Sequence, residues 1–191
     1  MLVPNDMKGQ IIGVLGLGGS GLAAVAALQA AGASVFACDD VKSQKEIPEI
    51  TLTSWRDWPW QRLQAMVISP GIPHSYPKPH PAASRANRLQ IPIISEVELA
   101  LRAKPKARLV AITGTNGKST TTALIGHCLK SAGCSVAIGG NLGDAACSLN
   151  DPGEHGTLVL ELSSYQLETT PSLKPSISIL LNISADHLDR H

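Results

Sequence analysis

The residues with the clearest capacity for chemistry lie between Ala111 and Thr121, where the chain reads AITGTNGKSTT. An apolar, β-branched run leads into Gly114 and Gly117, and Lys118 and Ser119 follow directly. Glycines at such a turn let backbone N–H groups converge on phosphate oxygens, and a following helix adds the positive end of its dipole. We therefore predict a phosphate-binding loop, with Lys118 on the β- and γ-phosphates and Ser119 near an accompanying Mg²⁺.

The spacing of this loop differs from that of the common P-loop. Only Thr115 and Asn116 separate its two glycines, whereas the motif Gly-x-x-x-x-Gly-Lys has a longer run. The segment alone therefore leaves a second interpretation open, a glycine-rich strand-to-helix turn with an exposed lysine. If the loop holds the phosphates of a nucleotide, its binding residues are Gly114, Thr115, Asn116, Gly117, Lys118, Ser119 and Thr120.

Polar residues also follow three other apolar runs in the second half of the chain. These residues are Asn141, Glu161 and the pair Asp186 and His187. Taken singly, each has an ordinary explanation: a turn asparagine, a solvated carboxylate and a capping pair. The carboxyl ends of parallel strands lie at one edge of a sheet, so we predict that these residues converge beside the phosphate-binding loop. Glu161 is then placed to hold Mg²⁺ directly or through water.

A second glycine-rich turn, GLGGSG at residues 16–21, follows an apolar run at residues 11–15. It opens an Ala/Leu-rich stretch of helical length, and Asp39 ends the next predicted strand. Gly-x-Gly-x-x-Gly between a strand and a helix, with a later acidic residue, is the dinucleotide-binding fingerprint. Alone, it favours an NAD-dependent oxidoreductase. A turn at Ser69 ends the strand 65–68, so we expect one ligand crevice lined by Gly16, Leu17, Gly18, Gly19, Ser20, Asp39, Ser69, Pro70 and Gly71.

Alternating strands and helices must position both turns. Strands are predicted at residues 11–15, 34–38, 65–68, 91–94, 135–138, 157–161 and 177–181, with a further short strand at 51–53. A capping box at Ser95–Glu98 predicts a helix to about Lys104, and residues 163–166 are predicted as a polar turn. Trp55, Trp58 and Trp60 are interpreted as packing residues. The charged linker 104–106 divides the α/β chain into domains at residues 1–104 and 107–191.

Composition limits the possible functions. The 191 residues are 43% hydrophobic and 16% charged, with a formal net charge of +1, which argues against a broad surface for nucleic acid or membrane. The four cysteines contain no Cys-x-x-Cys pair, which suits a reducing compartment. Residues 11–38 are uncharged and long enough to cross a bilayer, but their many glycines and alanines favour strand, turn, helix and strand. No signal peptide is evident at the N-terminus, and we expect a cytoplasmic monomer.

Three motifs, in order, resemble the Mur ligase family: GTNGKS at 114–119, ELSSYQL at 161–167 and NISADHLDR at 182–190. This family contains ATP-dependent, amide-forming enzymes that add amino acids to the peptidoglycan precursor. The resemblance covers essentially the whole chain and accounts for the short loop, because the family shares this glycine spacing. It implies a Rossmann-like N-terminal domain with a parallel sheet, followed by a truncated P-loop-type ATPase central domain.

Within the family, the turn at residues 16–22 and the sequence Ser69–Ile72 are most similar to the member that adds D-glutamate to UDP-N-acetylmuramoyl-L-alanine. In the implied reaction, ATP phosphorylates the precursor carboxylate, and the amine of D-glutamate then displaces phosphate. The resemblance implies that Lys118 binds the phosphates of ATP and that Ser119 and Glu161 hold a first Mg²⁺. It also implies that His187 binds a second metal and that Asn141 lies close to the reacting groups. Asp39 is then the contact on the uracil side. Asp40 and Val41 depart from the Thr-Arg pair of some members.

Members of the family are much longer than this chain, which ends just after the Asp-His motif. We therefore expect an inactive fragment that lacks the rest of the ATPase domain and the C-terminal domain. Three alternatives stay open: another Mur ligase, such as the one that adds L-alanine, a Rossmann oxidoreductase, and a non-catalytic nucleotide-binding module.

Overall fold

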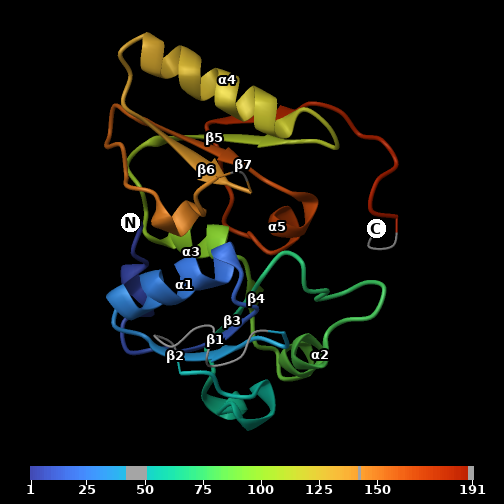
Figure 1. Ribbon diagram of the computed structural model, residues 1–191. Helices are drawn as coiled ribbons and strands as arrows, with labels where there is room; N and C mark the ends of the chain where they lie inside the picture. The colour runs from blue at the N-terminus through green and yellow to red at the C-terminus, as the bar shows by residue number, and fades with distance from the viewer. Residues whose placement is uncertain (42–50, 142, 189–191) are drawn as a thin grey trace.

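The computed structural model describes residues 1–41, 51–141 and 143–188 and contains two four-stranded parallel sheets (Figure 1). In sheet A the order is β2-β1-β3-β4, with β1 at Ile11–Leu15, β2 at Ser34–Cys38, β3 at Ala65–Ile68 and β4 at Ile93–Ile94. In sheet B the order is β6-β7-β5-β8, with β5 at Arg108–Thr113, β6 at Val136–Gly140, β7 at Thr157–Glu161 and β8 at Ile177–Leu180. The predicted α/β class is confirmed.

Helices cover both faces of each sheet. They are α1 at Gly19–Ala30, α2 at Pro81–Arg88, α3 at Glu96–Arg102, α4 at Lys118–Ser131 and α5 at Ser164–Glu168. Short 3₁₀ turns occur at Asn5–Met7, Trp55–Asp57, Trp60–Arg62 and Ala146–Ser148. Figure 1 shows α1 and α3 between the two sheets and α4 on the far side of sheet B. The chain thus forms stacked layers, with both sheets presenting the carboxyl ends of their strands to loops.

The layer between the sheets forms one continuous apolar core. It contains Leu28 of α1, Leu99 of α3 and Leu160 of β7, all fully buried. At the N-terminus, Leu2 donates its backbone N–H to the carbonyl of Cys147, which joins the two halves directly. The predicted linker separates the strands of sheet A from those of sheet B along the chain. Because both sheets pack against this one core, the division into domains at residues 104–107 stays a prediction.

Several local predictions are confirmed with small changes of boundary, and three are wrong. The predicted strand at residues 51–53 is reduced to a single bridge between Leu52 and Ala37. The predicted polar turn at residues 163–166 is instead the start of α5, where Ser163 and Gln166 form a capping box. At α3, Ser95 does accept the Glu98 N–H, but the Glu98 carboxylate binds Ser172 and Arg102 and therefore does not complete the expected box.

The tryptophans mostly serve as packing residues, as predicted. Trp58 and Trp60 are buried against the outer face of sheet A, and the Trp58 ring lies over Gly13 of β1, where a side chain would not fit.

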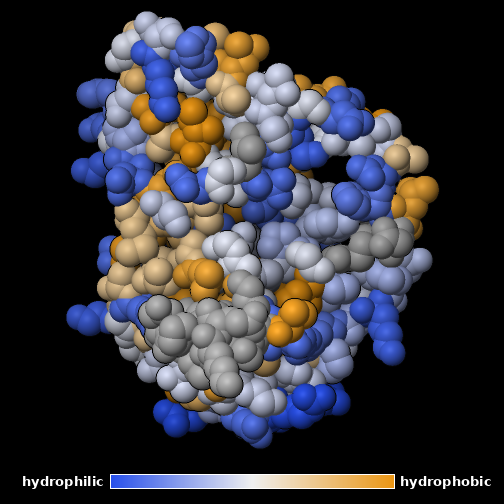
Figure 2. Space-filling view, in the orientation of Figure 1, coloured by the Kyte–Doolittle hydropathy of each residue, from blue (hydrophilic) through white to orange (hydrophobic). Residues whose placement is uncertain are grey.

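Residues 11–38 form the predicted strand, helix and strand. Of the helices in the described residues, none has the length and apolar character to cross a membrane. Figure 2 shows the molecule in the orientation of Figure 1. Hydrophilic side chains cover much of the face seen there, and a gap lies beside the C-terminal segment.

Candidate functional site

The predicted phosphate-binding loop joins β5 to α4. Gly114 and Gly117 have φ values of +141° and +85°, which glycine adopts most readily, and Gly117 is the residue immediately before α4. The first backbone N–H groups of α4 have no partner within the helix, so they remain available at the loop. A helix N-terminus of this kind can bind an anion, and phosphate binding at this loop stays a prediction.

Lys118 folds back over this loop. Its Nζ donates hydrogen bonds to the carbonyl oxygens of Gly114, at 2.7 Å, and Thr115, at 2.9 Å. The side chain is half-buried, and its ammonium group lies against the backbone of the loop. The alternative interpretation expected an exposed lysine, whereas Lys118 is half-buried and hydrogen-bonded.

Glu161 ends β7 beside Gly140, the last residue of β6. Its carboxylate is buried, with 1% of the residue exposed; Oε1 accepts a hydrogen bond of 2.9 Å from Asn141 Nδ2. Within the described part of the chain, Glu161 Oε2 has no hydrogen-bond partner. A carboxylate oxygen left unpaired in a buried position is suited to a cation, so Glu161 stays a candidate metal ligand.

The close contact between β6 and β7 depends on Gly140. Its φ is +101°, and a Cβ at this position would lie 2.3 Å from the Glu161 carbonyl oxygen. We expect Gly140→Ala to lower the free energy of unfolding by about 3 kcal/mol, through backbone strain and this clash. Gly153→Ala is the matched control, because Gly153 also has positive φ, at +85°, but open space around it, and about 1 kcal/mol is expected. Urea unfolding measures both, and equal losses would contradict the role of the contact.

A cavity of about 900 Å³ connects the two halves of the molecule. Five of the residues predicted in the second half line it, namely Gly114, Thr115, Lys118, Asn141 and His187. Pro70 and Gly71, from the turn after β3, line it as well. Glu161 is not among the lining residues, but its carboxylate accepts a hydrogen bond from Asn141, which is. The expected convergence of strand ends is therefore present, and it includes the edge of sheet A.

Other predicted residues do not line this cavity, as far as the described residues show. Those on the loop are Asn116, Gly117, Ser119 and Thr120, and those on sheet A are Gly16, Leu17, Gly18, Gly19, Ser20, Asp39 and Ser69. The sheet A set is still held together, because Asp39 accepts the Leu17 N–H at 2.6 Å and Ser69 donates to the Gly16 carbonyl at 3.0 Å. These residues form a neighbouring part of the same edge.

The segment after β8 supplies the imidazole. His187 is exposed, has a φ of +49° and lies 5.7 Å from the Tyr165 ring, measured between centroids. Sequence reasoning missed Tyr165 as a cavity residue because it treated residues 163–166 as a turn. The Ser163-x-x-Gln166 pattern was the available signal for a helix there. Across the described residues, no group of three or more His, Cys, Asp or Glu side chains forms a ready metal cage.

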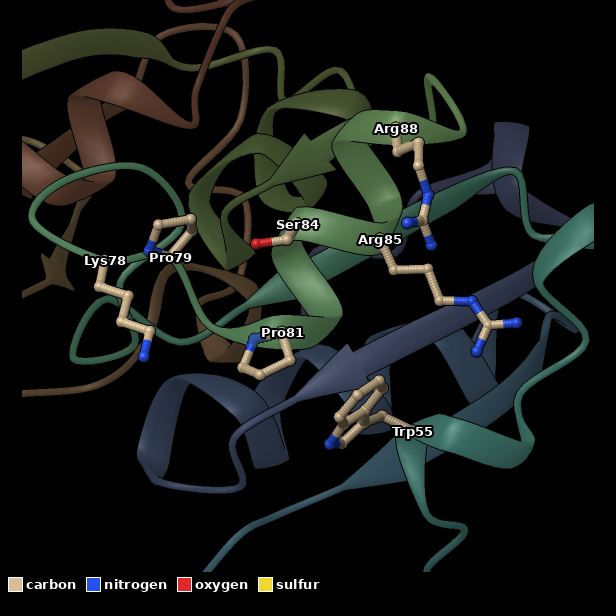
Figure 3. Close-up of a pocket in the computed structure, with 7 residues that line it drawn as sticks. All are labelled: Trp55, Lys78, Pro79, Pro81, Ser84, Arg85 and Arg88. Atoms are coloured by element: carbon tan, nitrogen blue, oxygen red, sulfur yellow. The ribbon is translucent and has the colours of Figure 1, made fainter.

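A second cavity, of about 450 Å³, lies between α2 and the turn at Trp55. Figure 3 shows Arg85 extending from α2 on one side of this cavity, with Lys78 on the opposite side. It contains none of the residues predicted for the site, and Arg85 packs over Trp60 at 4.9 Å. Trp55 is partly buried and packs against the apolar cluster beneath this surface.

Comparison with known proteins gives concordant matches. Residues 112–191 match the Mur ligase middle domain. The chain is 49% identical to the UDP-N-acetylmuramoylalanine--D-glutamate ligase of Rhodospirillum rubrum and 46% identical to that of Rhodopseudomonas palustris strain CGA009. In both cases all of this chain aligns and spans 42% of the relative. The crystal structure of UDP-N-acetylmuramate:L-alanyl-gamma-D-glutamyl-meso-diaminopimelate ligase from Neisseria meningitides has a similar fold, with a TM-score of 0.57, 20% identity and coverage of 96% of this chain and 63% of that one.

Proposed function

Because this chain belongs to the Mur ligase family, we propose that it carries the precursor site and part of the ATP site of an ATP-dependent ligase. The proposed reaction joins D-glutamate to UDP-N-acetylmuramoyl-L-alanine in peptidoglycan synthesis. One observation supports this most strongly: the cavity of about 900 Å³ has the phosphate-binding loop on one side and the Pro70–Gly71 turn of sheet A on the other. A phosphoryl transfer from nucleotide to precursor needs both substrates in one cavity.

The reaction brings two anions together, the triphosphate and the precursor carboxylate. Attack of that carboxylate on the γ-phosphorus forms an acyl phosphate and releases ADP, and the amine of D-glutamate then displaces phosphate to form the amide. We propose that Lys118 leaves its carbonyl partners and holds the β- and γ-phosphates, where its charge reduces the repulsion between the anions. Asn141 lines the cavity and is proposed to face the reacting groups while its amide holds Glu161.

The residues present fit Mg²⁺, which supplies charge neutralisation at the phosphates when it is bound. Magnesium prefers oxygen ligands and is usually held by one or two carboxylates together with substrate phosphates and water. Glu161, with its unpaired buried Oε2, and the Ser119 hydroxyl are proposed for one ion, and His187 for a second. The absence of a three-residue cage from the described residues is compatible with ions that arrive with the nucleotide.

The edge of sheet A is proposed to bind the uridine nucleotide of the precursor. Asp39 accepts N–H groups from Leu17 and Val41 and so orders the glycine-rich turn, and we propose that it contacts the uracil side of the ligand. We propose residues 1–104 as the precursor-binding domain and residues 107–191 as part of the ATP-binding domain. ATP and a nucleotide-linked precursor as substrates point to a cytoplasmic reaction, and we propose a monomer that binds neither nucleic acid nor membrane.

A titration separates this proposal from its alternatives. The chain is titrated calorimetrically with UDP-N-acetylmuramoyl-L-alanine, UDP-N-acetylmuramate and NADH. We expect saturable binding of the first and at least tenfold weaker binding of the second, because a site that encloses the L-alanyl group loses its contacts when that group is missing. Equal affinity for the two uridine ligands would overturn the D-glutamate assignment. Stronger binding of NADH would overturn the ligase proposal as a whole.

A further inference from the structure

The phosphate-binding loop and the segment after β8 are tied together by five hydrogen bonds. Asn116 donates its N–H to Asn182 Oδ1, and Asn182 Nδ2 donates to the Asn116 carbonyl, both at 2.9 Å. Thr115 donates its N–H to the Asn182 carbonyl at 3.0 Å. The Thr115 hydroxyl donates to the Ser184 carbonyl at 3.2 Å and accepts the Ser184 N–H at 3.0 Å. The loop is therefore clamped from the side of β8.

The Asn182 amide is suited to this contact because it has both a donor and an acceptor. It binds the N–H and the C=O of one residue, as a neighbouring strand would, and so fixes the orientation of both peptide groups. Gly114 allows the approach, since a Cβ there would lie 3.1 Å from the backbone nitrogen and oxygen of Asn182. The N–H groups of Thr115 and Asn116 are thereby used within the protein, which leaves those from Gly117 onward for phosphate.

The same clamp determines where His187 lies. Beyond β8, residues 182–187 are exposed, so little burial holds them in place. Their hydrogen bonds to the rest of the described chain go to Thr115 and Asn116, and the His187 ring contacts that of Tyr165. An exposed segment without such bonds loses its fixed conformation, because ordering each residue costs about 1 to 2 kcal/mol.

We propose that Asn182 is a positioning residue that couples the phosphate-binding loop to His187, so that a nucleotide in the loop and the imidazole at the cavity respond together. The sequence motif placed Thr115 and Asn116 among the nucleotide ligands, whereas their polar groups are engaged in the clamp. The coupling rests on the proposed function, since it takes the loop to be the ATP site.

The test uses two measurements on the chain: the dissociation constant of a fluorescent ATP analogue and the NMR signal of the His187 ring during ATP titration. The signal is assigned by its loss in His187→Gln. In the wild type we expect the His187 signal to shift with the same midpoint as nucleotide binding. In Asn182→Ala we expect affinity to fall roughly tenfold, from the loss of two hydrogen bonds, and the His187 shift to be lost or greatly reduced.

Two further variants separate the clamp from general damage. Asn182→Asp keeps an acceptor for the Asn116 N–H but opposes the Asn116 carbonyl with a second oxygen, so affinity should fall at least as far as in the alanine variant. Thr115→Val removes only the hydroxyl bonds to Ser184 and should weaken the His187 response more than nucleotide affinity. The control is Asn87→Ala, because the Asn87 side chain makes a single long hydrogen bond of 3.5 Å on α2.

Each outcome has a distinct meaning. If the wild type fails to bind the ATP analogue, the proposed function is wrong. If the wild type binds and Asn182→Ala keeps both its affinity, within twofold, and its His187 shift, the proposed function stands and the clamp is refuted. If Asn182→Ala does not fold, as judged by urea unfolding, the Thr115→Val result decides, and an unchanged His187 response in that variant refutes the coupling.

Discussion

Replacement of Lys118 by alanine is expected to weaken ATP binding by about a hundredfold. The Lys118 ammonium is the one side-chain cation that lines the large cavity at the loop, within the described part of the chain, and its hydrogen bonds to Gly114 and Thr115 show that it reaches the centre of the turn. A hydrogen bond to a charged partner contributes about 1.5 to 3 kcal/mol, and tenfold in affinity corresponds to about 1.4 kcal/mol. Titration with a fluorescent ATP analogue gives the dissociation constants.

The control for this substitution is Lys130→Ala, which removes an exposed lysine from the last turn of the same helix. It lowers the net charge equally but lies far along α4 from the loop, so we expect a change in affinity of less than twofold. Lys118→Arg keeps the charge but places it in a larger, planar group. We expect it to recover only part of the affinity, because a guanidinium cannot take the position of the compact ammonium between the Gly114 and Thr115 carbonyls. Binding by Lys118→Ala within twofold of the wild type would refute the assignment of this loop.

The sequence predicted those features that local residues determine. The β1 strand, the turn beginning at Gly16 and the helix ending before Gly32 follow from apolar runs and glycines whose φ values are indeed positive. The loop between β5 and α4 was predictable for the same reason. Parallel pairing then placed the strand ends at common edges, which is why Lys118 and His187 were expected at one cavity.

Contacts between distant segments could not be predicted in this way. The Ser95-x-x-Glu98 pattern indicated a capping box. The Glu98 carboxylate instead binds Ser172, whose N–H and hydroxyl both donate hydrogen bonds to Oε2. The clamp between Asn182 and Asn116 likewise depends on how β8 packs beside β5. Periodicity reports which face of an element is apolar, and it carries no information about which polar partner lies across the interface.

Glu96 presents the clearest case of a group that only the structure explains. The side chain lies in the first turn of α3, between the two sheets, and 3% of the residue is exposed. Oε1 accepts the N–H of Cys147, and Oε2 has no partner among the described residues. Burial raises the pKa of this carboxyl to about 7, and the hydrogen bond from Cys147 opposes that rise only in part.

We therefore expect Glu96→Gln to change the pH dependence of stability. Between pH 4.5 and pH 7 the folded wild type keeps the Glu96 proton while the unfolded chain releases it, so the wild type loses stability as the pH rises through this window. Below pH 4.5 both states are protonated, and above about pH 7 the folded protein contains a buried charge. Glutamine has no proton to lose, so the stability of the variant relative to the wild type should rise by about 3 kcal/mol between pH 4.5 and pH 8.

Urea unfolding at several pH values from 4.5 to 8 measures this difference directly. The comparison between variant and wild type cancels the titration of the other groups, which both proteins share. Glu154→Gln is the matched control, because it makes the same substitution at an exposed glutamate outside the layer between the sheets. Parallel profiles for Glu96→Gln and the wild type would mean that the carboxyl ionises normally in the folded protein. In that case water must reach the layer between the two sheets, and the core shared by the two halves would be less tightly closed than the packing of α1 and α3 implies.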